Sequence, residues 1–238
     1  MSQHKLLKDT SHRPWPLPSW PWKYYQEWNR VLFLHWAVDP ELLRPLIPAK
    51  LELDEIEGQA WVSLVAFTME QIRPKLLPAF PPVSNFDEIN IRTYVKSGNK
   101  TGVYFLSIEA GKRFSAWLAR SLSALPYRYS AMKRTADRYE AVNRKFDDRF
   151  RVEFNIRESK VEVSETDRWL TERYALFQDK GETIQRFEIH HAEWSIEEVE
   201  VHNLEVDYPR FSALLEGSPD RAHYSAGVKV LAWGGEKK

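Results

Sequence analysis

One short segment of the chain carries four hydrogen-bonding side chains at every second position. They are Glu88, Asn90, Arg92 and Tyr94. Because the intervening residues are apolar or β-branched, a β-strand would place the four polar side chains on one face. Such a face is either the solvated side of a sheet or the polar wall of a pocket inside a barrel. In a pocket, the carboxyl group of Glu88 is a candidate general acid or base.

A charge inside such a pocket needs a partner, because an isolated buried ion costs several kcal/mol. We therefore expect Glu88 and Arg92 inside or at the rim of one cavity, close to Tyr127. We also expect Glu88 to contact an arginine. The candidate partners are Arg92, Arg120 and Arg128.

The charge balance argues against polyanionic partners. The chain has 238 residues with 34 basic and 34 acidic side chains, so its formal net charge is zero. No excess of positive charge attracts nucleic acid or an anionic membrane, and we expect neither as a partner. Ten Trp and ten Tyr are more than an ordinary core needs. They favour either an aromatic-lined cavity for a small-molecule ligand or a homo-oligomer interface.

Several chemistries lack their motifs. There is no cysteine, no G-x-S-x-G, no phosphate loop and no G-x-G-x-x-G. His190 and His191 are adjacent on a predicted strand, so their side chains would point to opposite faces and could not share one metal ion. The histidines show neither H-x-H nor H-x-x-x-H spacing. We therefore expect no metal site and no cofactor.

The apolar runs are short. No stretch approaches the roughly 18 residues of a membrane span, and the N-terminal residues contain no apolar run typical of a signal peptide. The sequence thus predicts a cytoplasmic protein. An N-terminal segment, residues 1–27, alternates Pro with Trp and is expected to lie extended over the body. Residues 28–238 contain no linker and are expected to form a single domain.

The elements expected to position the polar segment are mostly strands. Ser84–Ile108 reads as a β-hairpin with its turn at SGNKTG. Further strands are expected at Arg30–Val38, Leu51–Asp54, Ala60–Met69, Arg138–Val142, Phe150–Ile156, Lys160–Val163, Thr183–His191, Val199–Leu204 and Ala226–Trp233. Many strands joined by short turns favour antiparallel pairing over a doubly wound α/β sheet.

Three helices are expected. Asp39 caps a short one that begins at Pro40 and ends before Pro48. The apolar periodicity of Lys112–Leu125 predicts a helix packed across the sheet, with Trp117 and Leu122 largely buried. A third is expected at Thr166–Phe177. The proline-rich segment Arg73–Ser84 is expected to be neither strand nor helix. The resulting fold class is α+β, with mainly antiparallel strands and a few packed helices.

Several motifs, in order along the chain, carry a family resemblance. They are LHWAVDPELLRPLIPAKLELD, SNFDEINIRTYV, GVYFLSIEA, LTERYALF, IHHAEW and AGVKVLAW. From about Trp28 to Trp233 the chain resembles the YqjF-like family of uncharacterised bacterial proteins. That family is distantly similar to the acetoacetate decarboxylase-like fold, an antiparallel barrel or cone that encloses a small-molecule cavity. The segment ARSLSALPYR is similar to the decarboxylases' GREL…PKK motif.

The resemblance has consequences for the site. In the decarboxylases, the first lysine after the proline forms a Schiff base and the second lowers its pKa; the corresponding positions here are Tyr127 and Arg128. Tyrosine cannot form an imine, and arginine stays protonated. The resemblance further implies that Glu88 stands where the family has its catalytic glutamate, and that Arg30 matches its carboxylate-binding arginine. The pocket is thus expected to persist without Schiff-base catalysis.

Three functions remain open. The first is binding of a small aromatic or carboxylated molecule by Arg30, Glu88, Arg92, Arg120, Tyr127 and Arg128. The second is an enzyme acting on a carbonyl substrate, with Glu88 as general acid or base and Tyr127 as proton donor or oxyanion stabiliser. The third is a structural or interaction protein whose aromatic residues form an oligomer interface. A buried Glu88 with a raised pKa beside Tyr127 in a closed cavity favours the enzyme. A cavity lined by aromatic side chains alone favours binding, and a filled core without a cavity favours the third.

Overall fold

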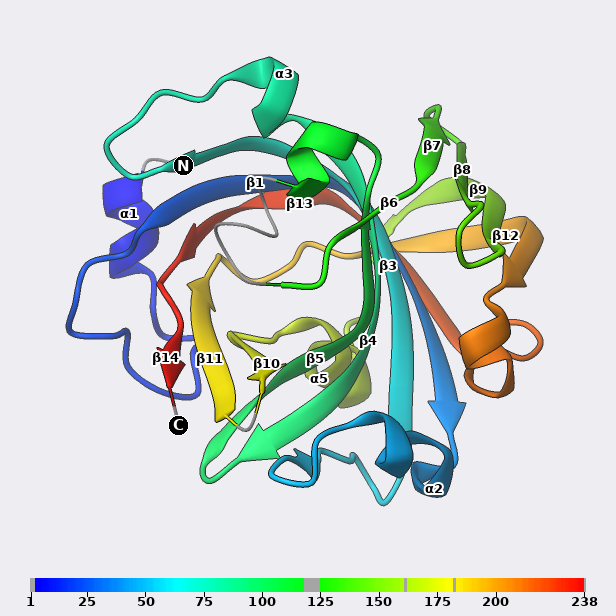
Figure 1. Ribbon diagram of the computed structural model, residues 1–238, viewed down its shortest axis with the longest axis horizontal. Coiled ribbons are helices and arrows are strands. Elements are labelled where there is room, and N and C mark those ends of the chain that lie inside the picture. Colours follow the sequence, from blue (N-terminus) through cyan, green and yellow to red (C-terminus); the bar gives the residue numbers. More distant parts are fainter. Residues whose placement is uncertain (1–2, 118–124, 161, 182, 238) are drawn as a thin grey trace.

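A closed ring of strands forms the centre of the computed structural model, which describes residues 3–117, 125–160, 162–181 and 183–237 (Figure 1). Successive neighbours around the ring pair with one another, and pairing of β11 with β13 closes it. The ring strands are β1 (Tyr24–Val38), β3 (Ala60–Pro74), β4 (Phe86–Ser97), β5 (Lys100–Ala110), β10 (Ala175–Lys180), β11 (Thr183–His190) and β13 (Arg221–Ala232). All pairs are antiparallel except β10 with β5, which is parallel.

A second layer continues from the ring at β13 and packs against its outer side (Figure 1). Its strands, in order of pairing, are β12 (Glu197–Asp207), β9 (Asp148–Lys160), β8 (Arg138–Asn143) and β7 (Ala131–Arg134). Three two-residue strands add to the sheet edges: β2 (Glu52–Leu53), β6 (Arg128–Tyr129) and β14 (Glu236–Lys237). The fold is the mainly antiparallel, ring-like α+β architecture that the sequence predicts.

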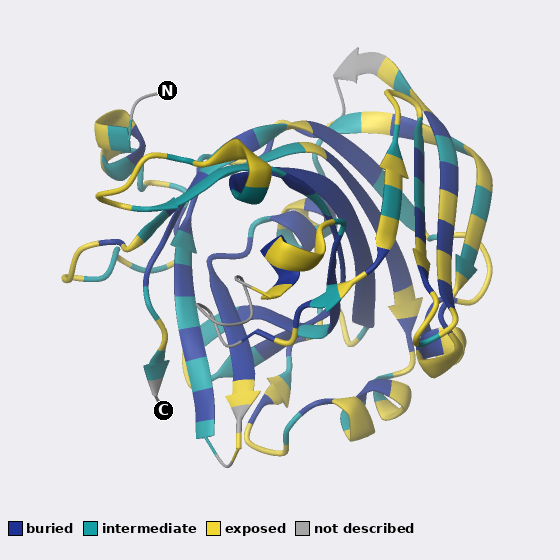
Figure 2. Ribbon diagram, turned by 45° about the horizontal axis from the view of Figure 1, so that its top comes forward, coloured by how far each residue is buried: buried dark blue, intermediate teal, exposed yellow. Residues whose placement is uncertain are grey.

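Two hydrophobic clusters explain why the central strands are apolar on both faces. Val31 and Phe33 of β1 point into the ring, where they belong to the inner cluster. Leu32 and Leu34 point outward and pack against β8 and β9. A strand covered on both sides reads as a continuous apolar run rather than an alternating one. The middle of the ring strands is accordingly buried (Figure 2).

The helices are short. They are α1 (Gln3–Lys8), α2 (Pro40–Leu43), the 3-10 turn η1 (Arg44–Leu46), α3 (Pro81–Ser84), α5 (Glu165–Thr171), the 3-10 turn η2 (Pro209–Leu214) and a helical turn at residues 113–117. Asp39 caps α2 as predicted, its side chain accepting from the Glu41 amide. The helix α3 corrects the expectation that Arg73–Ser84 is irregular. Proline is compatible with the first turn of a helix because no backbone donor is needed there.

Two helix predictions need correction. In the described part of Lys112–Leu125 only residues 113–117 are helical, and Leu122 lies outside the described residues. Trp117 is 61 % exposed and contacts the tilted ring of Phe114, at a centroid distance of 5.5 Å, instead of packing across the sheet. In this turn Ala116 is buried, whereas Phe114 and Trp117 are exposed. The predicted apolar stripe therefore faces outward over the described turn.

The expected helix at Thr166–Phe177 ends early. Helix α5 stops at Thr171, and Ala175–Lys180 forms β10, which pairs with both β5 and β11. Tertiary pairing overrides the helical periodicity here. Two smaller corrections follow. Strand β9 runs unbroken to Lys160, where a separate strand was expected at Lys160–Val163. The N-terminal segment, expected to be extended, contains helix α1 and enters β1 at Tyr24.

Candidate functional site

A cavity of about 240 Å³ lies within the ring. The polar face of β4 contributes Glu88, Asn90 and Arg92 to its wall, so the pocket interpretation of this strand holds. Tyr94, the fourth member of that face, is fully buried and donates to the Leu170 carbonyl at 2.9 Å. The other walls are largely apolar and aromatic, with Phe33, Phe67, Phe105, Phe187, Trp28 and Trp194 among them.

Glu88 is the most perturbed carboxyl group of this cavity. It is 2 % exposed, its Oε2 accepts from the Tyr127 hydroxyl at 2.8 Å, and its Oε1 accepts from the Asn90 amide at 3.4 Å. Burial raises the pKa of Glu88 to about 7, although both hydrogen bonds oppose the shift. Near neutral pH the group therefore exists in both protonation states, as a general acid or base requires.

The expected pairing of Glu88 with an arginine is wrong for Arg92 and Arg128. Among the described residues, Glu88 forms no ion pair, and its partners are the neutral side chains of Tyr127 and Asn90. Arg120, the third candidate partner, lies outside the described residues. A carboxyl group that protonates on burial does not need a cation, which is the physical reason for the difference.

Tyr127 reaches the cavity because the chain pairs with β5 directly after it. The short strand β6 runs parallel to β5 with Arg128 opposite Glu109, and this fixes the backbone next to Tyr127. The side chain is buried, and burial together with the Glu88 carboxylate raises the pKa of Tyr127 well above its usual value. The phenol therefore remains a hydrogen-bond donor at neutral pH.

Arg92 is a buried cation without an anion. It is 8 % exposed, and its guanidinium lies 5.8 Å from the Phe33 ring centroid and 6.0 Å from that of Tyr94. Its Nη2 makes one long hydrogen bond of 3.4 Å to the Leu170 carbonyl, and its Nε has no partner. No carboxylate of the described chain forms an ion pair with it.

Arg173 also lines the cavity, but its charge is neutralised. Its Nη1 forms a 2.5 Å ion pair with Asp54, and its guanidinium lies 4.0 Å from the Trp169 ring centroid. Nothing local in the sequence marks Arg173 as a cavity residue, because it lies between α5 and β10 and reaches the site through tertiary packing. The same holds for His191 and Trp194, which follow β11.

Two more of the predicted site residues lie away from the cavity. Arg30 is exposed, has φ of 54°, and donates to Thr68 Oγ1 at 2.9 Å. Arg128 lies over the Phe146 ring at 4.4 Å, on the side of the sheet opposite Tyr127. Consecutive residues of an extended chain point to opposite faces, so Tyr127 and Arg128 cannot both enter the cavity.

His190 and His191 point to opposite sides, as expected from the strand. His190 Nε2 is 2.8 Å from the Leu6 carbonyl, whereas His191 lines the cavity and stacks on Tyr174 with ring centroids 4.8 Å apart. Burial lowers the pKa of each to about 4, so both are neutral at physiological pH. Within the described residues, no group of three or more His, Cys, Asp or Glu side chains is arranged to hold a metal ion.

Comparison with known proteins places the chain in a family. The family model DUF2071, described as an uncharacterised conserved protein, matches residues 25–229. The uncharacterised protein YqjF of Bacillus subtilis (strain 168) is 34 % identical over 225 residues, which cover 91 % of this chain and 93 % of YqjF. The chain belongs to the DUF2071 family. None of the helices in the described part is long and apolar enough to cross a membrane.

Solved structures show the fold of this DUF2071 protein. Acetoacetate decarboxylase from Legionella pneumophila superimposes with a TM-score of 0.64 and 14 % identity, covering 98 % of this chain and 95 % of that one. The enduracididine biosynthesis enzyme MppR, complexed with pyruvate, gives a TM-score of 0.57 and 10 % identity over 94 % and 93 % of the two chains. The DUF2071 chain therefore has the acetoacetate decarboxylase-like fold.

Proposed function

We propose that this protein binds a small carboxylate that also carries a carbonyl or hydroxyl group, in the cavity within its ring. The observation that carries the proposal is Arg92, a buried guanidinium that faces the cavity without an anion among the described residues. An unpaired buried charge is costly, and a ligand carboxylate compensates it with charge-assisted hydrogen bonds. The pyruvate bound to MppR, a protein of the same fold, is a molecule of this class.

The rest of the polar face fits the other end of such a ligand. Glu88 lies four residues from Arg92 on the same strand, roughly 13 Å along the backbone. Its carboxyl group and the Tyr127 hydroxyl can donate to a carbonyl oxygen or accept from a hydroxyl group. Asn90 lies between them, and its Oδ1 has no partner. The site thus offers an anion anchor at one end and hydrogen-bonding groups at the other.

The proposed ligand is bound without a Schiff base. Tyr127 supplies no amine, and the one lysine found among the described cavity residues, Lys23, is exposed. A low lysine pKa requires burial or a neighbouring cation. Borohydride reduction with acetoacetate should leave the intact mass unchanged, and an adduct on Lys23 or another lysine would refute this part of the proposal.

A catalytic role is the alternative. The pKa of Glu88, about 7, suits proton transfer at neutral pH, and Tyr127 is placed to stabilise an oxyanion beside it. This alternative would be favoured if the wild-type protein turned over a carbonyl substrate and Glu88→Gln abolished that turnover. The presence of a cavity weighs against a purely structural role. The cytoplasmic location stays a prediction from the sequence.

The binding proposal is tested with 3-hydroxybutanoate as a chemically stable probe, by titration calorimetry. Arg92→Gln should weaken binding at least tenfold, because a charge-assisted hydrogen bond contributes about 1.5–3 kcal/mol. Arg128→Gln is the matched control, since that arginine is half-buried and lies outside the cavity. Equal affinity of wild type and Arg92→Gln would contradict the proposal.

A further inference from the structure

A second, larger cavity adjoins the polar one. Its volume is about 490 Å³, and it lies between the start of β1, the end of β3, helix α3 and the helical turn at residues 113–117. Tyr24, Gln26, Leu125 and Tyr127 line both cavities. Because the Tyr127 hydroxyl donates to Glu88, the two spaces meet at the polar end of the proposed binding site.

The described wall of the second cavity offers few groups to a polar molecule. Most of its lining is apolar, with Ile72, Leu77, Pro78, Phe80, Val83, Phe86 and Phe114 among the residues. Three polar side chains in its described wall are already engaged with the protein. Ser115 donates to the Val83 carbonyl at 2.9 Å, Ser84 accepts from the Phe80 amide at 2.9 Å, and Gln26 accepts from Trp28 at 2.8 Å.

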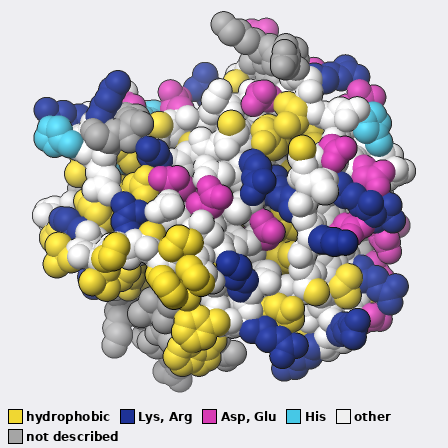
Figure 3. Space-filling view, turned by 90° about the horizontal axis from the view of Figure 1, so that it is seen from above, with side chains coloured by type: hydrophobic (Ala, Val, Ile, Leu, Met, Phe, Trp, Pro, Cys, Tyr) yellow, Lys and Arg dark blue, Asp and Glu magenta, His cyan; other side chains and the backbone are white. Residues whose placement is uncertain are grey.

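The charged residue of the wall is also engaged. Arg73 donates to the Gln71 carbonyl at 3.0 Å, and its guanidinium lies 4.1 Å from the Tyr25 ring centroid. On the face that carries α3, hydrophobic side chains gather in one area (Figure 3). Leu77, Phe80 and Phe114 are each more than half exposed there. A cavity of about 490 Å³ with a largely apolar wall falls within the size range of small-molecule sites.

The residues that line both cavities indicate what kind of ligand could occupy them. Arg92 lines the inner cavity but not the second one, whereas Tyr127 lines both. A ligand held by its carboxylate at Arg92 can direct its other end past Asn90 toward Glu88 and Tyr127, and its further atoms continue into the apolar space. We infer that the ligand is amphipathic: a carboxylate with a polar group near it and an alkyl or aryl tail that occupies the second cavity. This inference rests on the function proposed above.

The test is a chain-length series of 3-hydroxybutanoate, 3-hydroxyhexanoate and 3-hydroxyoctanoate, measured by titration calorimetry. Each buried methylene strengthens binding by roughly three- to fourfold, so the octanoate should bind on the order of a hundredfold more tightly than the butanoate. The double substitution Leu77→Ser and Phe80→Ser should flatten this dependence and leave the butanoate affinity unchanged. Leu76→Ser is the matched control, because Leu76 is 90 % exposed, adjacent in sequence, and absent from the cavity wall.

The outcomes separate the two proposals. If all three acids bind with equal affinity, the inference that a tail occupies the second cavity is refuted and the proposed carboxylate site stands. No binding of any of them overturns both. A chain-length dependence that survives the double substitution places the tail elsewhere and also overturns the inference. If the double substitution instead dissociates an oligomer, as judged by sedimentation, the cavity is a subunit contact and the inference fails.

Discussion

The most informative single residue is Glu88, whose environment is neutral where the sequence suggested an ion pair. Its pKa of about 7 lies above the ordinary value of 4.5 because burial disfavours the charged form. A carboxyl group with a raised pKa in the folded state stabilises the fold only while it is protonated. Its favourable contribution is full below pH 4.5 and is lost as the pH rises through about 7.

Glu88→Gln should therefore become more stable relative to wild type as the pH rises. Between pH 5 and pH 8 the difference in free energy of unfolding should shift by about 2 to 3 kcal/mol in favour of the variant. Urea denaturation at both pH values measures it. Glu200→Gln is the control, because Arg157 holds the pKa of Glu200 below its usual range and gives the opposite sign. A pH-independent difference for Glu88→Gln would show that the carboxyl group is not desolvated.

At this scale the sequence predicts the inward-facing residues but not their partners. The period-two pattern correctly groups Glu88, Asn90 and Arg92 on one cavity wall, because side-chain alternation is a local property of a strand. The partner of Glu88 depends on how far burial shifts its pKa, which no pattern encodes. Arg173 enters the site through a contact with Asp54, 119 positions away.

Among the elements, β10 joins β5 to β11 in the ring. It pairs in parallel with β5 and antiparallel with β11. Leu176 and Phe177 of β10 pair with Val103 and Tyr104 of β5. Next to this contact, Gly102 leaves no room for a side chain: an added Cβ would lie 2.4 Å from the Ala175 carbonyl oxygen. The close approach of two backbones explains the glycine near the start of the hairpin's second strand.

Gly102→Ala should destabilise the protein by about 1 to 3 kcal/mol or more, because the new methyl group pushes β10 away from β5. Thr101→Ala is the matched control on the same strand, and strand propensity alone limits its effect to less than about 1 kcal/mol. Urea unfolding of both variants measures the difference. Equal destabilisation would mean that β10 adjusts freely and does not hold the ring closed.

Element types were predictable where local signals agree with tertiary pairing. The hairpin from Ser84 to Ile108 is found as β4 and β5, because alternation and a glycine turn both specify it. Ala175–Lys180 has helical apolar spacing but is a strand, since it must pair with β5 and β11. The capping box of Ser164 with Asp167 starts α5 and says nothing about its end.

On the scale of the whole molecule, ring closure joins segments far apart in the chain. Strand β1, near the N-terminus, pairs along its length with β13, near the C-terminus. Such pairs have no local signature. Strand spacing therefore predicted antiparallel sheets, the family resemblance supplied the barrel, and neither predicted the second layer around β9 and β12. The Pro/Trp-rich segment before β1 is a further case of contacts between distant parts of the chain.

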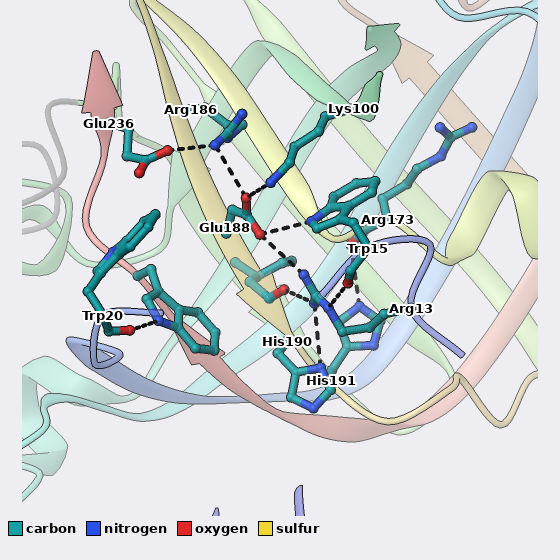
Figure 4. A network of polar contacts seen from close by, with 12 residues as sticks. Arg13, Trp15, Trp20, Lys100, Arg173, Arg186, Glu188, His190, His191 and Glu236 are labelled. Carbon is teal, nitrogen blue, oxygen red and sulfur yellow. Dashed lines mark hydrogen bonds and ion pairs between the residues drawn. The ribbon is translucent and has the colours of Figure 1, made fainter. Parts of the chain in front are cut away.

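Glu188 anchors that N-terminal segment to the ring (Figure 4). Its Oε2 accepts from Trp15 Nε1 at 2.9 Å and pairs with Arg13 at 3.3 Å, while its Oε1 pairs with Lys100 and, at 3.5 Å, with Arg186. One buried carboxylate thus holds three cations. Only Arg186 has a further carboxylate partner among the described residues, Glu236 at 2.5 Å. Arg13 of the N-terminal segment is thus attached to the ring through the same carboxylate that binds Lys100 and Arg186.

Glu188→Gln should release the N-terminal segment before the ring unfolds. Removing one partner of a buried ion pair costs about 3 to 5 kcal/mol, and here the loss leaves Arg13 and Lys100 without an anion. Hydrogen exchange should accelerate at residues 3–23 far more than in β3 and β4, and trypsin should cut earlier after Lys5 and Lys8. Glu236→Gln, which touches only Arg186, should leave exchange at residues 3–23 unchanged. A uniform loss of protection across the chain would instead make this network part of the global core, because the segment and the ring would then unfold as one cooperative unit.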